Sequence, residues 1–199
     1  MTSRVGSRLL AVAVLMALTA PSAAHAQTVT VRDAVGDVEA FYFNEAQDTL
    51  PAPHYAASDI TLTVTAYGME RLKVTVHLRD LRHASALRTD VVIRTPDRRY
   101  FGSVVRGPRK VRTLFGHPRR GELECEGFTG TYEGGKDRVT VVVPAACIDS
   151  PRWVQVGVST TGLELEDSDS EDVPFHVDDG GRDGDGGHWP RFGQRVRRG

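Results

Sequence analysis

The chain has 199 residues, of which 40% are hydrophobic and 26% are charged, and its formal net charge is -1. This length is too short for two full domains but long enough for one domain with a sizeable core. No segment after residue 26 is apolar enough to form a membrane-spanning helix.

The first 26 residues have the features of a secretory signal peptide. Arg4 and Arg8 precede the apolar run LLAVAVLMALTA, and the segment closes with AHA at positions 24–26. The run is about 12 residues long, whereas a membrane-spanning helix needs about 20. We therefore expect residues 1–26 to be removed before Gln27, which leaves a secreted, extracellular chain with no membrane anchor.

The next feature is VRDAVGDVEAF, in which Asp33 and Asp37 flank Gly36 directly after an expected strand at 28–31. Two carboxylates around a glycine can supply ligands to a calcium ion. The same residues can also accept hydrogen bonds from backbone N–H groups and so only stabilise a turn. The spacing of the two aspartates leaves both interpretations open.

Residues 44–58, NEAQDTLPAPHYAAS, contain two prolines and little periodicity. This composition predicts a long loop over one end of the domain.

Apolar and polar residues then alternate with a period of two over residues 59–79, which predicts two strands. Gly68 to Glu70 connect them as a hairpin. The residues expected to face the core are Ile60, Leu62, Val64 and Ala66 in the first strand and Leu72, Val74, Val76 and Leu78 in the second.

Similar runs predict strands at 90–94, 100–105, 111–115, 123–131, 138–143, 153–159 and 172–177. With these short strands and no convincing amphipathic helix, we expect an all-β fold. The predicted architecture is an antiparallel β-sandwich, jelly-roll or immunoglobulin-like, over residues 27–177. The glycine-rich residues 178–199, acidic and then basic, should be largely disordered.

Cys125 and Cys147 are the only cysteines. Export would place them in an oxidising compartment, and neither a CxxC spacing nor a neighbouring histidine suggests a reactive or metal-binding pair. We therefore expect one structural disulfide. Closing a loop of this length should stabilise the fold by about 3 kcal/mol.

Charge is distributed unevenly along the chain. Residues 71–120 contain 14 Lys and Arg against three acids, and residues 164–185 contain ten acids against one arginine. The basic segment can bind an anionic wall polymer or polysaccharide, for which an extracellular chain is better placed than for nucleic acid. The alternative is a solvated sheet face, since 22 arginines against three lysines suggest a coding bias.

The stretches VRDAVGDV, HLRDL, RVTVVVPAACI, PRWVQVGV and VDDGGRDG occur in this order. Through them the chain resembles, over about residues 28–184, a group of small secreted proteins of unassigned function from high-GC Gram-positive bacteria. The opening D-x-x-G-D, followed by Asp59 and Ile60, is also loosely similar to carbohydrate-binding jelly-roll modules, although Ala34 stands where these often have proline. That similarity implies a calcium ion held in part by the N-terminal aspartates.

The candidate metal site includes residues from both ends of the domain. First and last strands often lie side by side in a sandwich, so the end of the strand at 172–177 can bring Asp178 or Asp179 to the opening turn. The candidate calcium ligands are therefore Asp33, Asp37, Asp178 and Asp179. Calcium is the only cofactor that the sequence suggests.

The sequence contains no catalytic motif. It has no G-x-S-x-G elbow and no HExxH, and its histidines are scattered. Many carboxylates are present, but spacing alone selects no glycosidase pair. We therefore expect a non-enzymatic binding or structural module. The alternatives are a calcium-stabilised carbohydrate-binding jelly roll and a hydrolase with an unrecognised carboxylate pair.

Overall fold

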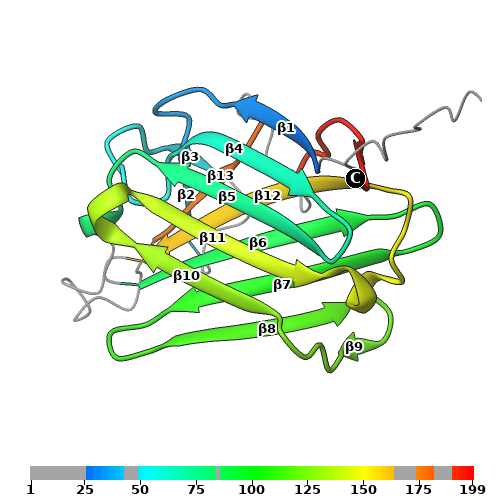
Figure 1. Ribbon diagram of the computed structural model, residues 1–199. Coiled ribbons are helices and arrows are strands. Elements are labelled where there is room, and N and C mark those ends of the chain that lie inside the picture. The colour runs from blue at the N-terminus through cyan, green and yellow to red at the C-terminus, as the bar shows by residue number, and fades with distance from the viewer. Residues whose placement is uncertain (1–25, 43–48, 84–85, 164–173, 182–189) are drawn as a thin grey trace, which may run out of the picture.

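The computed structural model describes residues 26–42, 49–83, 86–163, 174–181 and 190–199. Within these ranges the chain forms two antiparallel β-sheets packed as a sandwich, and its helices are three short 3-10 turns (Figure 1). The predicted all-β sandwich is confirmed. Of the predicted signal peptide, only Ala26 lies within the described residues.

The first sheet has the strand order β1-β4-β5-β11-β10 and is in front in Figure 1. The β4–β5 hairpin forms its centre together with β11, and β1 and β10 are its edges. Its strands are β1 (Gln27–Arg32), β4 (Ile60–Tyr67), β5 (Arg71–Leu78), β10 (Thr129–Glu133) and β11 (Arg138–Pro144).

The second sheet has the order β3-β2-β13-β12-β6-β7-β8-β9, and the short β14 pairs with β12 beyond the end of β13. Its strands are β2 (Glu39–Phe41), β3 (Leu50–Pro51), β6 (Ala86–Arg94), β7 (Arg99–Arg106), β8 (Val111–His117), β9 (Gly121–Glu122), β12 (Trp153–Leu163), β13 (Phe175–Asp179) and β14 (Val196–Arg197). The 3-10 turns are η1 (Leu81–His83), η2 (Gly134–Lys136) and η3 (Ala145–Ile148), and none of them has the length or hydropathy of a membrane-spanning segment.

The core lies between the sheets, and its composition follows the alternation only in part. In β5, the predicted inward residues Leu72, Val74, Val76 and Leu78 are all buried. In β4 the prediction is correct for Ile60 and wrong beyond it. The register shifts at a β-bulge between Ile60 and Leu62, and the extra residue moves the following side chains to the opposite faces.

After the bulge, the buried residues of β4 are Thr63, Thr65 and Tyr67, whereas the predicted inward residues Leu62, Val64 and Ala66 are only half-buried. Tyr67 is fully buried, and its hydroxyl donates a hydrogen bond to the carbonyl of Pro151 at 3.0 Å.

Three other segments differ from the sequence-based expectation. Residues 123–128 are irregular, so of the single strand expected at 123–131 only the last three residues lie in a strand, β10. The predicted loop at 44–58 contains β3 and buries Tyr55, Ala57 and Ser58, while residues 43–48 lie outside the described residues.

The third segment that differs from the expectation is the tail, residues 178–199, for which the sequence predicts disorder. Residues 190–199 pack against β12 and bury Val196, and residues 182–189 lie outside the described residues. Backbone hydrogen bonds fix this segment, from the N–H of Gly193 to the carbonyl of Val156, from Arg198 to Arg152 and from Gly199 to Tyr67.

The predicted Cys125–Cys147 disulfide is present, with a Cα–Cα distance of 5.6 Å. It ties the irregular segment before β10 to η3, which follows β11. Because β10 and β11 are neighbours at the edge of the first sheet, the bond closes one end of this edge hairpin.

Candidate metal centre

The opening turn, residues 33–37, connects the two sheets, because β1 belongs to the first and β2 to the second. Gly36 has a φ of +83°, a conformation that costs a residue with a side chain about 1 kcal/mol or more. Its N–H donates to Asp59 Oδ2 at 2.9 Å, and the same carboxylate receives Arg79 Nη1 at 3.0 Å. Asp59 is fully buried, and its hydrogen bond from Gly36 fixes the turn to the start of β4.

Within the part of the chain that the structure describes, the turn brings two aspartates to a third. Asp33, Asp37 and Asp178 each place one carboxylate oxygen so that the three atoms lie within 4.8 Å of one another. Asp178 comes from β13, more than a hundred residues away from the other two. The sequence-based prediction named all three residues.

Backbone N–H groups position two of these carboxylates. Asp33 Oδ1 accepts from the N–H of Gly181 at 2.9 Å, which ties the turn to the chain just after β13. The oxygens of Asp178 accept from the N–H groups of Ile60 and Asp179. These bonds fix the two carboxylates from outside the cluster.

The cluster is electrostatically costly. Burial raises the pKa of Asp33 to about 7, an effect that the Gly181 N–H partly opposes and the negative charge of Asp37 increases. Burial likewise raises the pKa of Asp178 to about 8, with the charges of Asp37 and Asp33 adding to it. Asp33 and Asp178 therefore stay protonated at pH values at which an exposed aspartate is ionised, because both are buried next to like charge.

The donor set fits a hard cation. All three donors are carboxylate oxygens, as calcium prefers, and calcium binds oxygen at about 2.3 to 2.6 Å. Two ligands of one such ion are thus separated by at most about 4.6 to 5.2 Å, which agrees with the 4.8 Å limit of this cluster. Asp33 Oδ2 is inaccessible to solvent and has no hydrogen-bond partner among the described residues, so a lone pair is available for an ion.

Asp179, the fourth predicted ligand, does not belong to this group of three. Its carboxylate accepts from the N–H of Arg191 at 3.2 Å, in the segment that leads to β14. The reason given for the site also needs correction, because β1 and β13 are not neighbours in one sheet. β1 pairs with β4, and β13 pairs with β12 and β2. The aspartates meet where the two sheets face each other.

Asp59 and Arg79 are the functional residues that sequence reasoning missed. The sequence relates Asp59 only to the loose similarity with carbohydrate-binding modules, and it assigns no role to Arg79. Burial raises the pKa of Asp59, and the nearby Arg79 guanidinium opposes that rise. A charged pair at the start of one strand and the end of its hairpin partner is a signal that could have suggested this contact.

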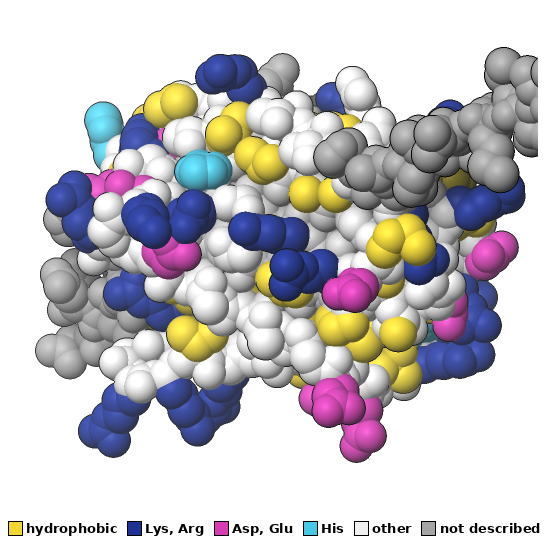
Figure 2. All heavy atoms as spheres, in the orientation of Figure 1, with side chains coloured by type: hydrophobic (Ala, Val, Ile, Leu, Met, Phe, Trp, Pro, Cys, Tyr) yellow, Lys and Arg dark blue, Asp and Glu magenta, His cyan; other side chains and the backbone are white. Residues whose placement is uncertain are grey.

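The basic segment 71–120 does not form one surface. Its strands belong to both sheets, and several of its arginines have local carboxylate partners, as in the pairs Arg82–Asp80, Arg88–Asp90 and Arg98–Asp149. On the face shown in Figure 2, the Lys and Arg side chains are spread in small groups among acidic, apolar and neutral atoms.

Comparison of the chain with models of protein families, with curated proteins and with solved structures found no match. The geometry of the site therefore carries the functional argument alone.

Proposed function

We propose that this protein is a secreted, non-enzymatic β-sandwich that uses one calcium ion to join the two ends of its domain and serves as a binding or structural module outside the cell. The observation that carries the proposal is the meeting of Asp33, Asp37 and Asp178 within 4.8 Å. A calcium ion would neutralise the negative charges of these carboxylates, whose ionisation burial and mutual repulsion otherwise disfavour.

The geometry favours a structural ion over a catalytic carboxylate pair. In glycosidases the two carboxyl groups lie about 5 to 9.5 Å apart across an open cleft. Here the oxygens are closer, and Asp178 is only 4% exposed. The disulfide is compatible with an oxidising, extracellular compartment, which agrees with the predicted signal peptide.

Thermal unfolding with calcium and with a chelator tests the proposal. A ligand at about 100 times its Kd stabilises the folded state by about 2.7 kcal/mol, which for this length corresponds to a rise in Tm of about 5 to 10 °C. We expect saturating calcium to raise the Tm by that amount relative to EDTA. An unchanged Tm would remove the ion from this proposal.

Asp33→Asn is the matched variant. The amide keeps an oxygen that can accept from the N–H of Gly181, but it loses the negative charge. We expect D33N to fold and to lose most of the calcium response. Asp97→Asn, at an exposed turn outside the cluster, should keep the full response. Equal responses of the two variants would contradict a site at Asp33.

A second candidate function is carbohydrate binding on the second sheet. An open cavity of about 350 Å³ is lined by Phe41 and Phe175, whose rings stack at 5.2 Å, and by Arg88 and Asp90. Aromatic faces beside an ion pair suit a sugar ring with hydroxyl groups. Calorimetric titration with soluble oligosaccharides checks this possibility. We expect saturable binding that Arg88→Gln weakens and that Arg71→Gln, an exposed position in the first sheet, leaves unchanged. No heat with any sugar would reject it.

A further inference from the structure

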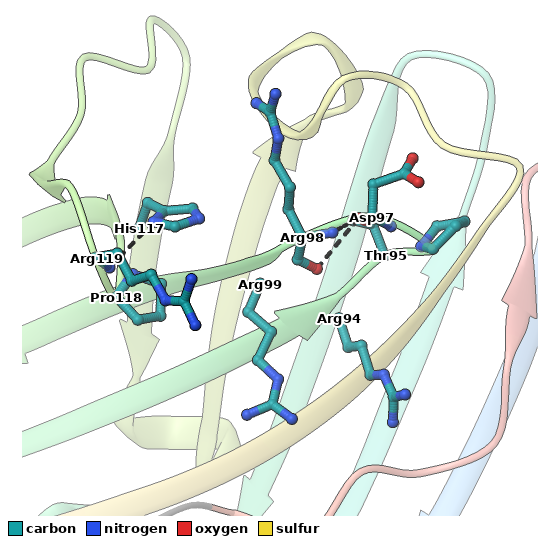
Figure 3. Close-up of a pocket in the computed structure, with 9 residues that line it drawn as sticks. Arg94, Thr95, Asp97, Arg98, Arg99, His117, Pro118 and Arg119 are labelled. Atoms are coloured by element: carbon teal, nitrogen blue, oxygen red, sulfur yellow. Dashed lines mark hydrogen bonds between the residues drawn. The ribbon is translucent and has the colours of Figure 1, made fainter.

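A cleft of about 550 Å³ opens at the end of the second sheet where β6 turns into β7. It lies between the β6–β7 hairpin and the turn after β8 (Figure 3). Its charged lining consists of four arginines, one histidine and one aspartate: Arg94, Arg98, Arg99, Arg119, His117 and Asp97.

Arg94 and Arg99 are directly opposite each other in the β6–β7 ladder. Cross-strand neighbours of this kind have Cβ atoms about 4.5 to 5.5 Å apart, and like charges in these positions destabilise a sheet. Figure 3 shows both side chains extending to the same side of the hairpin, with the Arg119 guanidinium turned toward Arg99. Within the described ranges no carboxylate forms an ion pair with these three arginines.

The other two charged groups of the hairpin are directed elsewhere. Arg98 extends to the opposite side (Figure 3) and pairs with Asp149 at 3.2 Å. The Asp97 carboxylate also extends away from Arg94 and Arg99. The side of the cleft that holds Arg94, Arg99 and Arg119 is therefore positive, and the one lining acid does not neutralise it.

The cleft is held in place before any ligand arrives. Thr95 is buried in the turn between β6 and β7. Its Oγ1 accepts hydrogen bonds from the N–H groups of Arg98 and Asp97 at 3.0 and 3.3 Å. The Arg99 guanidinium lies 5.6 Å from the centre of the Phe192 ring. Across the cleft, His117 Nδ1 accepts from the N–H of Arg119 at 3.1 Å. These contacts reduce the ordering cost of binding.

We propose that this cleft binds a tetrahedral oxyanion, a phosphate or sulfate ester group of an extracellular polymer, through Arg94, Arg99 and Arg119. Each guanidinium presents a planar fork of N–H donors that suits two oxygens of an anion. Three forks offer more donors than the two oxygens of one carboxylate can accept. A tetrahedral group with three or more oxygens uses them better.

This site shares no residue with the carboxylate cluster, so it does not depend on the proposed calcium ion. Loss of anion binding would leave the calcium response unchanged, and loss of the calcium response would leave anion binding unchanged. The two proposals can therefore fail separately.

Binding of the purified protein to three polymers of matched length tests the inference: polyphosphate, dextran sulfate and poly-glutamate. We expect salt-dependent binding of at least one of the first two, tighter than binding of poly-glutamate. The ratio of the polyphosphate and dextran sulfate affinities shows whether the cleft prefers phosphate or sulfate groups. Poly-glutamate binding as tight as either would overturn the inference.

The decisive comparison is between two double variants that each remove two positive charges. R94Q/R99Q changes the cleft, whereas R109Q/R112Q changes exposed arginines at the other end of β7 and β8. We expect the first to weaken binding by about 10- to 100-fold, the effect of losing charge-assisted hydrogen bonds, and the second by less than about 3-fold. Equal losses would mean diffuse attraction by net charge and would overturn the site.

R94K/R99K separates charge from geometry, because lysine keeps the positive charge without the planar fork. We expect it to bind polyphosphate or dextran sulfate more weakly than the wild type and to lose the preference over poly-glutamate. Wild-type affinity and preference in this variant would contradict recognition by the guanidinium forks.

Discussion

Asp33 and Asp178 have pKa values raised far above the ordinary 3.8 because the fold buries them beside Asp37. A raised pKa means that the folded state holds protons that the unfolded chain has already released. Without a cation, the contribution of these two groups to the free energy of unfolding is therefore highest below about pH 4. This contribution falls as the pH rises toward about 8. Calcium competes with those same protons.

The calcium response should consequently grow with pH. We expect the difference in Tm between calcium and EDTA to be small at about pH 5, where both carboxyls are protonated in the folded state, and largest at about pH 8. Differential scanning fluorimetry across this range measures it, with the D97N protein as control. A response that stays constant from about pH 5 to about pH 8 would contradict binding to these carboxylates.

Residue by residue, local spacing revealed more of the site than topology did. The pair around Gly36 could be identified because a turn brings residues four apart together. Asp178 was expected from a general tendency of sandwiches, and it does reach the pair, but from the opposite sheet. The charges and hairpin positions of Asp59 and Arg79 could have suggested their contact, but the burial of Asp59 could not be predicted, because burial of a charge depends on the packing of the whole domain.

At the scale of elements, alternation was a good guide where a strand is regular. All four predicted inward residues of β5 are buried. The β-bulge in β4 reversed the prediction for the rest of that strand, because a single inserted residue exchanges the two faces. Nothing in ITLTVTAY marks the bulge, since threonine is compatible with either face.

The shortest strands could not be predicted from the sequence for a different reason. β2, β3 and β9 have three residues or fewer, too few for a period of two to be visible. Glycine in β10 has a structural use that composition does not reveal. A Cβ at Gly130 would lie 2.3 Å from the nearest atom of Val104, a buried residue of the other sheet. This position allows the two sheets to approach closely.

At the scale of the molecule, the carboxylate cluster and the Cys125–Cys147 disulfide lie at opposite ends of the first sheet, whose strands Figure 1 shows. Asp178 accepts from the N–H of Ile60, where β4 begins, so the carboxylate cluster lies at that end. η3, with Cys147, follows Pro144, which pairs with Arg71 at the other end of the β4–β5 hairpin. The eight residues of β4 separate the two ends by about 25 Å.

Removing the disulfide tests whether the two closures are independent. The double variant C125S/C147S should lower the free energy of unfolding by about 3 kcal/mol, because the unfolded chain regains the freedom of the open loop. Sites more than about 10 Å apart with no shared partners contribute additively. Urea unfolding of both proteins with calcium and with EDTA should therefore give the same calcium increment. A much smaller increment in the variant would show that the two ends are coupled through the sheets, and that the ion holds the hairpin as well as the turn.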